Sequence, residues 1–94
     1  MKLKWTRRAL RQLAEAQDYI AKDNPTAARQ IAERIAEAAR LLLTQPEMGR
    51  PGRIAGTREW VVQRTQYFLV YRLYEDTLQI LRVLHGKQDW PPTD

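Results

Sequence analysis

The chain has no cysteine and only one histidine, His85, among its 94 residues. The absence of cysteine excludes disulfide scaffolds, thiol catalysis and cysteine-bound zinc, and one histidine cannot build a histidine-based metal site. We therefore expect no metal and no other cofactor. The sequence also lacks the uncharged apolar run of roughly 18 residues that a membrane span needs, and its first residues do not resemble a signal peptide. These absences predict a cytoplasmic protein without a membrane partner.

Positive charge is abundant: the formal net charge is +5 at pH 7. It is concentrated between Gly49 and Arg72, where five arginines accompany one acid, Glu59; the arginines are Arg50, Arg53, Arg58, Arg64 and Arg72. Basic surfaces raise encounter rates with anionic partners. Charge therefore favours a nucleic acid, a ribosome or an acidic protein segment as the partner, without choosing among them.

The first half of the chain has the periodicity of two helices. Thr6 is a plausible N-cap for a helix that ends near Lys22, and Asn24 followed by Pro25 begins a second helix that runs to about Thr44. Apolar residues recur at helical spacing in both. The first stripe is Ala9, Leu13, Ala16 and Ile20, widened by Leu10, and the second is Ala28, Ile31, Ile35, Ala38 or Ala39, and Leu42. Small alanines permit close packing, so we expect an antiparallel helical hairpin.

The second half changes to strand patterns after a Pro- and Gly-rich loop from Pro46 to Gly52. Three strands are expected over residues 57–62, 67–74 and 77–84, and the alternating residues 2–5 predict a further one. The prediction is a single α+β domain over residues 1–94, with the N-terminal helical hairpin packed on one face of a small antiparallel β-sheet.

A short turn at Glu75-Asp76 predicts the pairing of the last two strands. With Tyr74 opposite Thr77, the expected partners are Arg72 with Gln79, Tyr71 with Ile80, and Leu69 with Arg82. One face of this hairpin then carries Leu69, Tyr71, Leu73, Leu78 and Ile80, and the other carries Phe68, Val70, Leu81 and Val83.

Both of these faces are apolar, and the helices can cover only one of them. The second is either capped by the chain's own C-terminal residues or left as a docking surface, and we favour a partner segment. Trp90, followed by two prolines, is interpreted as a plug at the open end of the sheet, with base stacking as the alternative.

Four residues could cleave RNA through its own 2′-hydroxyl, a reaction that needs a base, an acid and cations on the phosphate. Glu59 or His85 could act as the base, Arg72 and Arg82 could hold the phosphate, and His85 or a tyrosine could act as the acid. Each also has a structural interpretation. Arg82 could pair with Glu59 or Asp89, and His85 could bond to the backbone at a strand end.

Three segments together resemble the ParE/RelE superfamily of bacterial toxins, and most closely its ParE-type, plasmid-stabilisation branch. They are Gly56 to Glu59, Tyr67-Phe68-Leu69-Val70-Tyr71-Arg72, and Arg82 to Pro91, which includes Leu84-His85-Gly86-Lys87-Gln88-Asp89-Trp90. The resemblance implies a toxin of a type II toxin–antitoxin module that arrests growth. It also implies a hetero-oligomer with a cognate acidic antitoxin, whose amphipathic segment folds as it binds.

Within this superfamily, ParE-like members act on DNA gyrase without being nucleases, whereas RelE-like members cleave mRNA on the ribosome. RelE-like nucleases commonly carry Arg after the Tyr that starts the central strand, and this chain has Phe68 after Tyr67. We therefore expect a gyrase inhibitor that is not itself an enzyme. The alternatives are a ribosome-dependent endoribonuclease and, less favoured, a plain nucleic-acid-binding module.

The expected sites follow from these assignments. Six residues are predicted to contact the target: Arg58, Arg72, Arg82, His85, Lys87 and Trp90. Four apolar residues of the second face are predicted to bind the antitoxin: Phe68, Val70, Leu81 and Val83. The catalytic set Glu59, Arg72, Arg82 and His85 applies only to the ribonuclease alternative.

Overall fold

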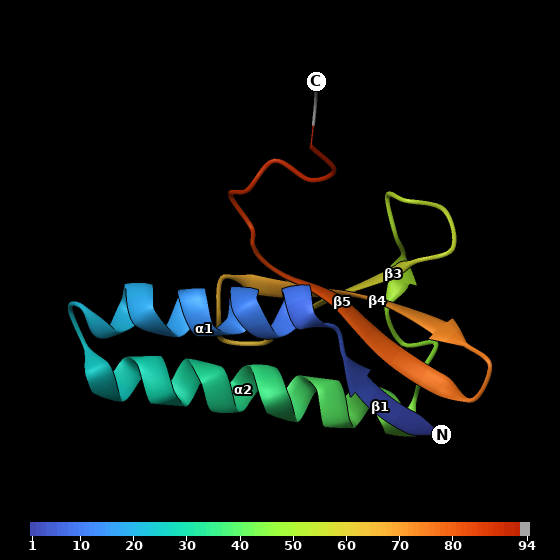
Figure 1. Ribbon diagram of the computed structural model, residues 1–94, viewed down its shortest axis with the longest axis horizontal. Helices are drawn as coiled ribbons and strands as arrows, with labels where there is room; N and C mark the ends of the chain where they lie inside the picture. Colours follow the sequence, from blue (N-terminus) through green and yellow to red (C-terminus); the bar gives the residue numbers. More distant parts are fainter. Residues whose placement is uncertain (93–94) are drawn as a thin grey trace.

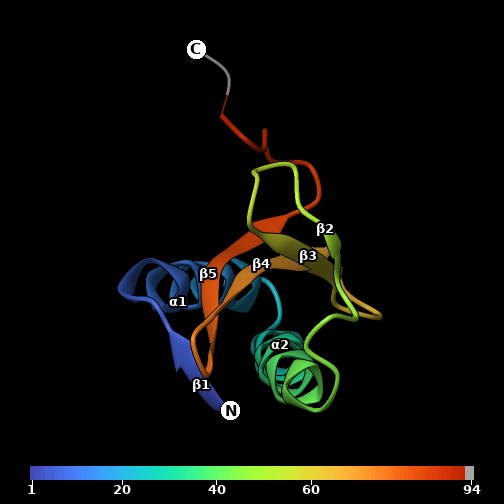
Figure 2. The ribbon, with the colours of Figure 1, turned by 90° about the vertical axis from the view of Figure 1, so that its right-hand side faces the viewer.

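The computed structural model describes residues 1–92 and contains two helices and five strands. In chain order they are β1 (Lys2–Trp5), α1 (Arg7–Ala21), α2 (Pro25–Thr44), β2 (Arg50–Pro51), β3 (Arg58–Val61), β4 (Tyr67–Tyr74) and β5 (Thr77–His85). The helices form an antiparallel hairpin on one side of the sheet (Figure 1). An end view shows the C-terminal tail and the loop between β2 and β3 together on the other side (Figure 2).

Both helices begin where the capping residues predict. The Thr6 hydroxyl accepts a hydrogen bond from the Ala9 N–H at 3.2 Å, and the Asn24 side chain accepts one from the Ala27 N–H at 3.1 Å. The predicted stripes face the core, with one correction. Leu10 is 51% exposed and does not widen the first stripe. No helix in the described part of the chain has the length and apolar character needed to cross a bilayer.

The sheet has the strand order β1-β5-β4-β3-β2, and β4 pairs with β5 in the antiparallel direction as predicted. Its pairings are antiparallel except that β1 joins β5 in parallel, which makes the sheet mixed. The long connection that a parallel pair requires runs here through both helices and then through β2, β3 and β4. β2 was expected to be loop. Its two residues pair with Arg58 and Glu59, a stretch too short to leave a periodic signal.

The β4–β5 register agrees with the prediction near the turn and departs from it beyond. Tyr71 faces Ile80 as expected, but an irregularity between Val70 and Tyr71 makes Leu69 face Val83 instead of Arg82. One extra residue in β5, a β-bulge, accounts for the shift, and a one-residue shift exchanges the faces of all later side chains. Beyond the bulge, the predicted alternation is therefore reversed.

The bulge corrects the membership of the second face. Val83 is 3% exposed and belongs to the core beneath the helices, and Leu81 is only half-buried and outside the second cluster. Phe68 and Val70 lie on the second face as predicted, and Leu84 joins them there. Of the four residues predicted to bind the antitoxin, two therefore share this face.

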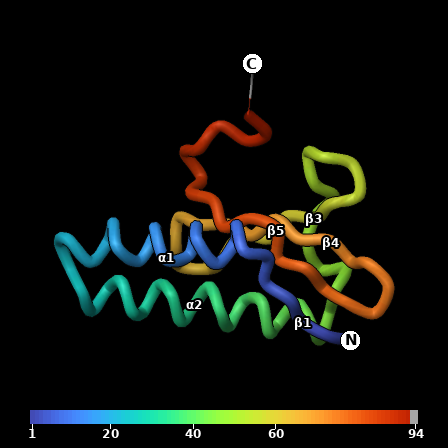
Figure 3. Tube along the Cα trace, viewed as in Figure 1, coloured from blue at the N-terminus to red at the C-terminus, as the bar shows by residue number. Residues whose placement is uncertain are grey.

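The chain itself closes much of that second face. Phe68, Val70 and Leu84 are at most 5% exposed, and Trp90 from the tail packs against them. The tail and the loop before β3 rise on the same side of the sheet (Figure 3). The expectation that a partner, and not the chain's own C-terminal residues, covers these side chains is therefore wrong. The interpretation of Trp90 as a plug fits the geometry.

Tyr71 fixes the loop that follows α2. Its buried hydroxyl donates to the Pro46 carbonyl at 2.7 Å and accepts from the Gly49 N–H at 2.9 Å. A Cβ at position 49 would lie 2.5 Å from this hydroxyl oxygen, so the position requires glycine. Arg58 completes the anchor, because its Nη1 donates to the carbonyls of Glu47 and Gly49 at 3.1 and 2.7 Å. These hydrogen bonds hold the loop in the position from which β2 pairs with β3.

Replacing Tyr71 with phenylalanine should destabilise the protein by about 1–3 kcal/mol, because a buried N–H and a carbonyl would both lose their partner. Urea unfolding followed by circular dichroism measures the change. Tyr74→Phe is the matched control, since the Tyr74 side chain is 53% exposed. Equal midpoints for the two variants would contradict a structural role for the Tyr71 hydroxyl.

Candidate functional site

Glu59 is the only buried charged residue in the described part of the chain. It lies on β3 opposite Val70, and its side chain is 1% exposed. Oε1 lies 3.0 Å from Arg50 Nη2 and 3.1 Å from Arg53 Nη2, and Oε2 accepts from the Arg53 backbone N–H at 2.9 Å. Two of the five arginines between residues 49 and 72 are therefore bound to the single acid of that segment.

The environment of Glu59 keeps its carboxylate ionised. Burial acts to raise its pKa, but the hydrogen bonds from Arg53 and Arg50 and the charges of the two guanidinium groups outweigh burial and lower the pKa below its ordinary value. A general base works best with a pKa near the working pH. Glu59 is thus a poor proton acceptor and a good structural anchor.

Arginine side chains tie the tail to the sheet. Arg53 Nη1 donates to the Trp90 carbonyl at 2.9 Å, and its guanidinium lies 5.4 Å from the centre of the Phe68 ring. The Arg82 guanidinium lies 5.4 Å from the centre of the Trp90 ring. Trp90 is therefore held by a cation–π contact to its ring from Arg82 and by a hydrogen bond to its carbonyl from Arg53. Glu59 therefore supports Trp90 indirectly, by holding Arg53.

Arg82 is half-buried and has Arg8 for a neighbour. Burial lowers the pKa of its guanidinium, and the charge of Arg8 lowers it further. Of the two acids considered as partners of Arg82, Glu59 and Asp89, Glu59 is bound instead by Arg50 and Arg53. Arg82 remains charged, since arginine stays protonated in proteins. It therefore contributes a positive charge beside the plug.

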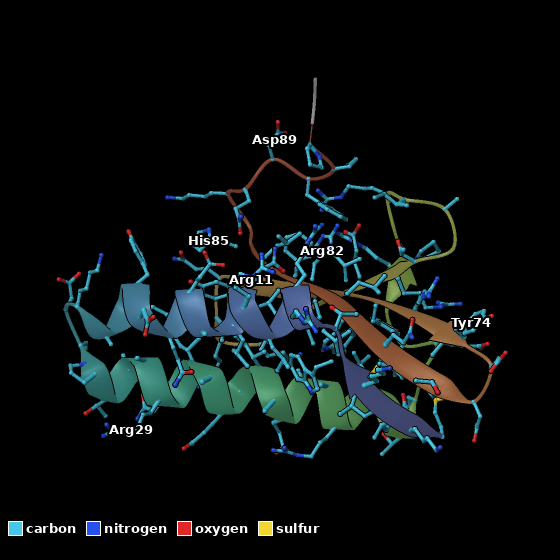
Figure 4. All side chains as sticks on the ribbon, in the orientation of Figure 1. Arg11, Arg29, Tyr74, Arg82, His85 and Asp89 are labelled. Atoms are coloured by element: carbon cyan, nitrogen blue, oxygen red, sulfur yellow. The ribbon has the colours of Figure 1, made fainter. Side chains whose placement is uncertain are left out.

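Two cations on α1 were missed by the sequence prediction. Gln12 Oε1 accepts from the Val83 N–H at 2.8 Å and the Thr6 hydroxyl donates to the Leu81 carbonyl at 3.3 Å, so this part of α1 lies against β5. The helix positions of Arg8 and Arg11 place both along that seam. Arg11, Arg82, His85 and Asp89 lie on the tail side of the molecule, whereas Arg29 is on the opposite side, below α2 (Figure 4).

His85 has both ring nitrogens occupied. Nδ1 accepts from the Lys87 N–H at 3.1 Å, which makes Nε2 the donor to the Gln66 side chain at 2.6 Å in the neutral ring. The edge of the ring also meets the Tyr67 ring, with 5.3 Å between centres. The structural interpretation of His85 at the end of β5 thus fits the geometry.

Arg72 is at the far end of the sheet from His85. It donates from Nε to the Gln79 side chain at 2.6 Å and lies over the Tyr74 ring. His85 is opposite Tyr67, five residues from Arg72 along β4, or about 16 Å at a rise of about 3.3 Å per residue. The structure therefore does not bring together the four residues predicted for RNA cleavage.

Acidification tests the Glu59 anchor. Its folded-state pKa is lower than the ordinary 4.5, so its contribution to stability is complete above about pH 4.5 and is lost as pH falls through the lower folded-state value. Glu59→Gln should lower the free energy of unfolding by about 1–3 kcal/mol at pH 7. In acid, the free energy of unfolding of this variant should decrease less steeply with falling pH than that of the parent protein. Urea unfolding at several pH values measures both. Glu37→Gln is the control, because the Glu37–Arg40 pair is exposed; identical acid profiles would argue against the anchor.

Comparison with known proteins assigns the family. Residues 3–90 match the sequence model of the ParE toxin of type II toxin–antitoxin systems, parDE. Toxin Y4kP of Sinorhizobium fredii is 46% identical over 90 residues, which cover 96% of this chain and 93% of the relative. Toxin RelE2 of Caulobacter vibrioides is 38% identical over 82 residues, covering 87% and 91%.

Solved structures give the same result. A chain of the chromosomal ParDE toxin–antitoxin system from P. aeruginosa superimposes with a TM-score of 0.81 at 30% identity, covering 90% of this chain and 95% of that one. A YoeB/ParE toxin from Agrobacterium tumefaciens shares the fold, with a TM-score of 0.61 at 18% identity over 90% and 98% of the two chains. The described residues therefore form a ParE/RelE-type fold, and the chain belongs to the ParE family of type II toxin–antitoxin toxins.

Proposed function

We propose that this toxin inhibits DNA gyrase by direct protein contact and performs no catalysis of its own. One observation carries the proposal: the side chains suited to RNA cleavage are separated or already bound. Glu59 is ionised and held by Arg50 and Arg53, both ring nitrogens of His85 are occupied, and Arg72 is at the opposite end of the sheet. A contact inhibitor needs none of them to converge. Acting on gyrase would place the protein in the bacterial cytoplasm.

The target-binding face under this proposal surrounds the plug. Arg82 lies over Trp90, Arg8 adjoins Arg82, and Lys87 is exposed on the tail. A set of cations around an aromatic group suits an anionic surface on the target. We no longer include Arg58 among the residues that contact the target, because its guanidinium is bound to two loop carbonyls. Arg72 is exposed and stays a predicted contact, at the other end of the sheet from His85.

We further propose that an acidic antitoxin neutralises the toxin, as in the family to which it belongs. The net charge of +5 supports an acidic partner. Phe68 and Val70, both predicted to bind it, lie beneath Trp90. An antitoxin that reached them would have to displace the tail.

A paired assay tests the choice of target. The purified toxin should make gyrase accumulate cleaved DNA, read on an agarose gel, while translation continues in a cell-free extract. Translation arrest with cut mRNA and intact gyrase activity would instead establish the ribonuclease alternative. The name of the Caulobacter relative, toxin RelE2, is the reason to test this alternative. Tight binding to DNA or RNA with neither effect would indicate a plain binding module.

Arginine substitutions test the proposed face. Arg82→Gln should weaken gyrase inhibition by about tenfold, which corresponds to the loss of roughly 1.4 kcal/mol of contact energy. Arg29→Gln is the matched control, since Arg29 lies on the other side of the molecule (Figure 4). The measurement is the toxin concentration that gives half-maximal gyrase-mediated cleavage. If both variants were as potent as the parent protein, Arg82 would have no part in target binding.

A further inference from the structure

The net positive charge of the chain arises from its first residues. Of the 16 lysines and arginines, five lie within residues 1–14, and no aspartate or glutamate lies there. The other 11 cations equal the 11 acids in number, so the formal net charge of +5 belongs to this segment alone. The segment holds β1 and the first half of α1. Its cations are Lys2, Lys4, Arg7, Arg8 and Arg11.

The fold lays this segment along one side of β5. β1 pairs in parallel with residues 77–80 of β5. α1 then takes its place, with the Thr6 hydroxyl bonded to the Leu81 carbonyl and the Gln12 side chain bonded to the Val83 N–H. Figure 1 shows β1 and α1 following one another beside β5. With a rise of about 3.3 Å per strand residue and about 1.5 Å per helix residue, residues 2–11 cover on the order of 15 Å.

The lysines of β1 face away from the helices. Leu3 and Trp5 pack against the core beneath the helical hairpin, and successive side chains of a strand point to opposite faces. Lys2 and Lys4 are both exposed and therefore lie on the tail side of the sheet. Arg82 lies on that same side (Figure 4).

Arg72 widens this row of cations across the sheet. Lys4 is opposite Gln79 on β5, and Gln79 is opposite Arg72 on β4, so the three side chains lie side by side on one face. Arg72 donates to the Gln79 side chain at 2.6 Å, which fixes its direction. Two strand spacings of about 4.8 Å separate the backbones of Lys4 and Arg72 by about 10 Å. We refer to Lys4, Arg8, Arg11 and Arg72 as the cationic track.

The folding of the chain does not account for this arrangement. α1 has no acid in its first turn and begins with Arg7 and Arg8, although the helix dipole disfavours positive charge there. Arg8 also lies close to half-buried Arg82, where burial and then the charge of Arg8 lower the pKa of the Arg82 guanidinium. Like charges at close range repel, and an anion bound between them would remove that repulsion. These cations are therefore placed for an anionic ligand.

The shape of the cationic track favours a linear polyanion. Each strand of duplex DNA carries one phosphate per about 3.4 Å of helix axis, so a stretch on the order of 15 Å meets about four of them. Two acids stand at the ends of the track: Asp76 pairs with the amino terminus at 3.6 Å, and Glu15 follows Arg11 by one helical turn. Asp89 is out on the tail (Figure 4). A regular row of phosphates therefore suits the track better than the scattered carboxylates of a folded protein.

We propose that the cationic track binds the phosphate backbone of duplex DNA, and that in the inhibited complex this DNA is the duplex held by gyrase. The second part rests on the proposed gyrase inhibition. The track meets the proposed target face where Arg8 adjoins Arg82. One bound toxin would therefore contact the enzyme around Trp90 and the DNA along β1 and α1. Phosphate contacts carry no sequence information, so binding should not depend on the DNA sequence.

Salt dependence tests the contact with DNA. The purified toxin is titrated into a fluorescently labelled duplex of about 30 base pairs and arbitrary sequence, at about 50 to 200 mM salt, and anisotropy gives the association constant. Four phosphate contacts predict that the logarithm of this constant falls against the logarithm of salt concentration with a slope of about −3.6. A slope near zero, or tighter binding to single-stranded RNA of the same length, would overturn the proposal.

Matched substitutions locate the contact. Arg11→Gln and Lys4→Gln should each weaken DNA binding by about five- to tenfold at about 50 mM salt and reduce the steepness of the slope by about 0.9. Arg29→Gln and Lys22→Gln are the controls, because they remove the same charges from exposed positions outside the track. Arg29 lies on the opposite side of the molecule (Figure 4). Circular dichroism checks that every variant is folded. Equal losses in track variants and controls would mean that only net charge matters, and the track would be wrong.

A binding assay with gyrase tests whether the DNA is that of the target. The parent toxin should bind DNA-loaded gyrase about tenfold more tightly than gyrase alone, and Arg11→Gln should remove most of this gain. Equal affinity for the two forms would overturn the link to gyrase-bound DNA. A toxin that inhibits gyrase without binding DNA would refute the track and leave the proposed function intact. A toxin that binds DNA through the track without affecting gyrase would refute the proposed function and leave the DNA site intact.

Discussion

The β-bulge in β5 is the constraint on which the rest of the structure depends. It lets β5 hold one more residue than β4 over the paired length, so side chains beyond it change faces. Val83 turns into the core beneath the helices, and Arg82 turns out beside the tail. Without the bulge, an arginine would lie under the helical hairpin and a valine beside Trp90. The fold would then bury a charge and lose its cationic face.

A second constraint is how the chain uses its arginines. Three of the five between residues 49 and 72 serve the structure: two hold Glu59, and Arg58 holds the loop after α2. A small domain buries little apolar surface, so the charged hydrogen bonds that order its loops contribute a larger share of its stability than they would in a large domain. Arg64 and Arg72 stay exposed, and further cations lie at Arg8, Arg11 and Arg82 on the seam between α1 and β5. The local charge in the sequence therefore did not reveal the cations on α1.

The molecule presents two exposed surfaces that meet at Lys87, which lies on the tail and lines the cavity beside Val61. The tail side carries Trp90 with arginines beside it, and the β3 edge carries exposed apolar residues. The tail remains the element that an overlapping partner would have to move.

The sequence by itself determined the helical hairpin, its caps, the longer strands and the family. Capping residues, apolar periodicity and the turn at Glu75-Asp76 are local signals, and local hydrogen bonds and side-chain spacing are enough to produce them. Tertiary structure alone decided the bulge, the two-residue β2, the partners of Glu59 and the closure of the second face by Trp90. Each of these depends on contacts between residues far apart in the chain, which leave no periodic trace. The surroundings of Arg82 and His85 also came from such contacts, because residue type gives a side chain its chemistry and only packing gives it a direction and a neighbour.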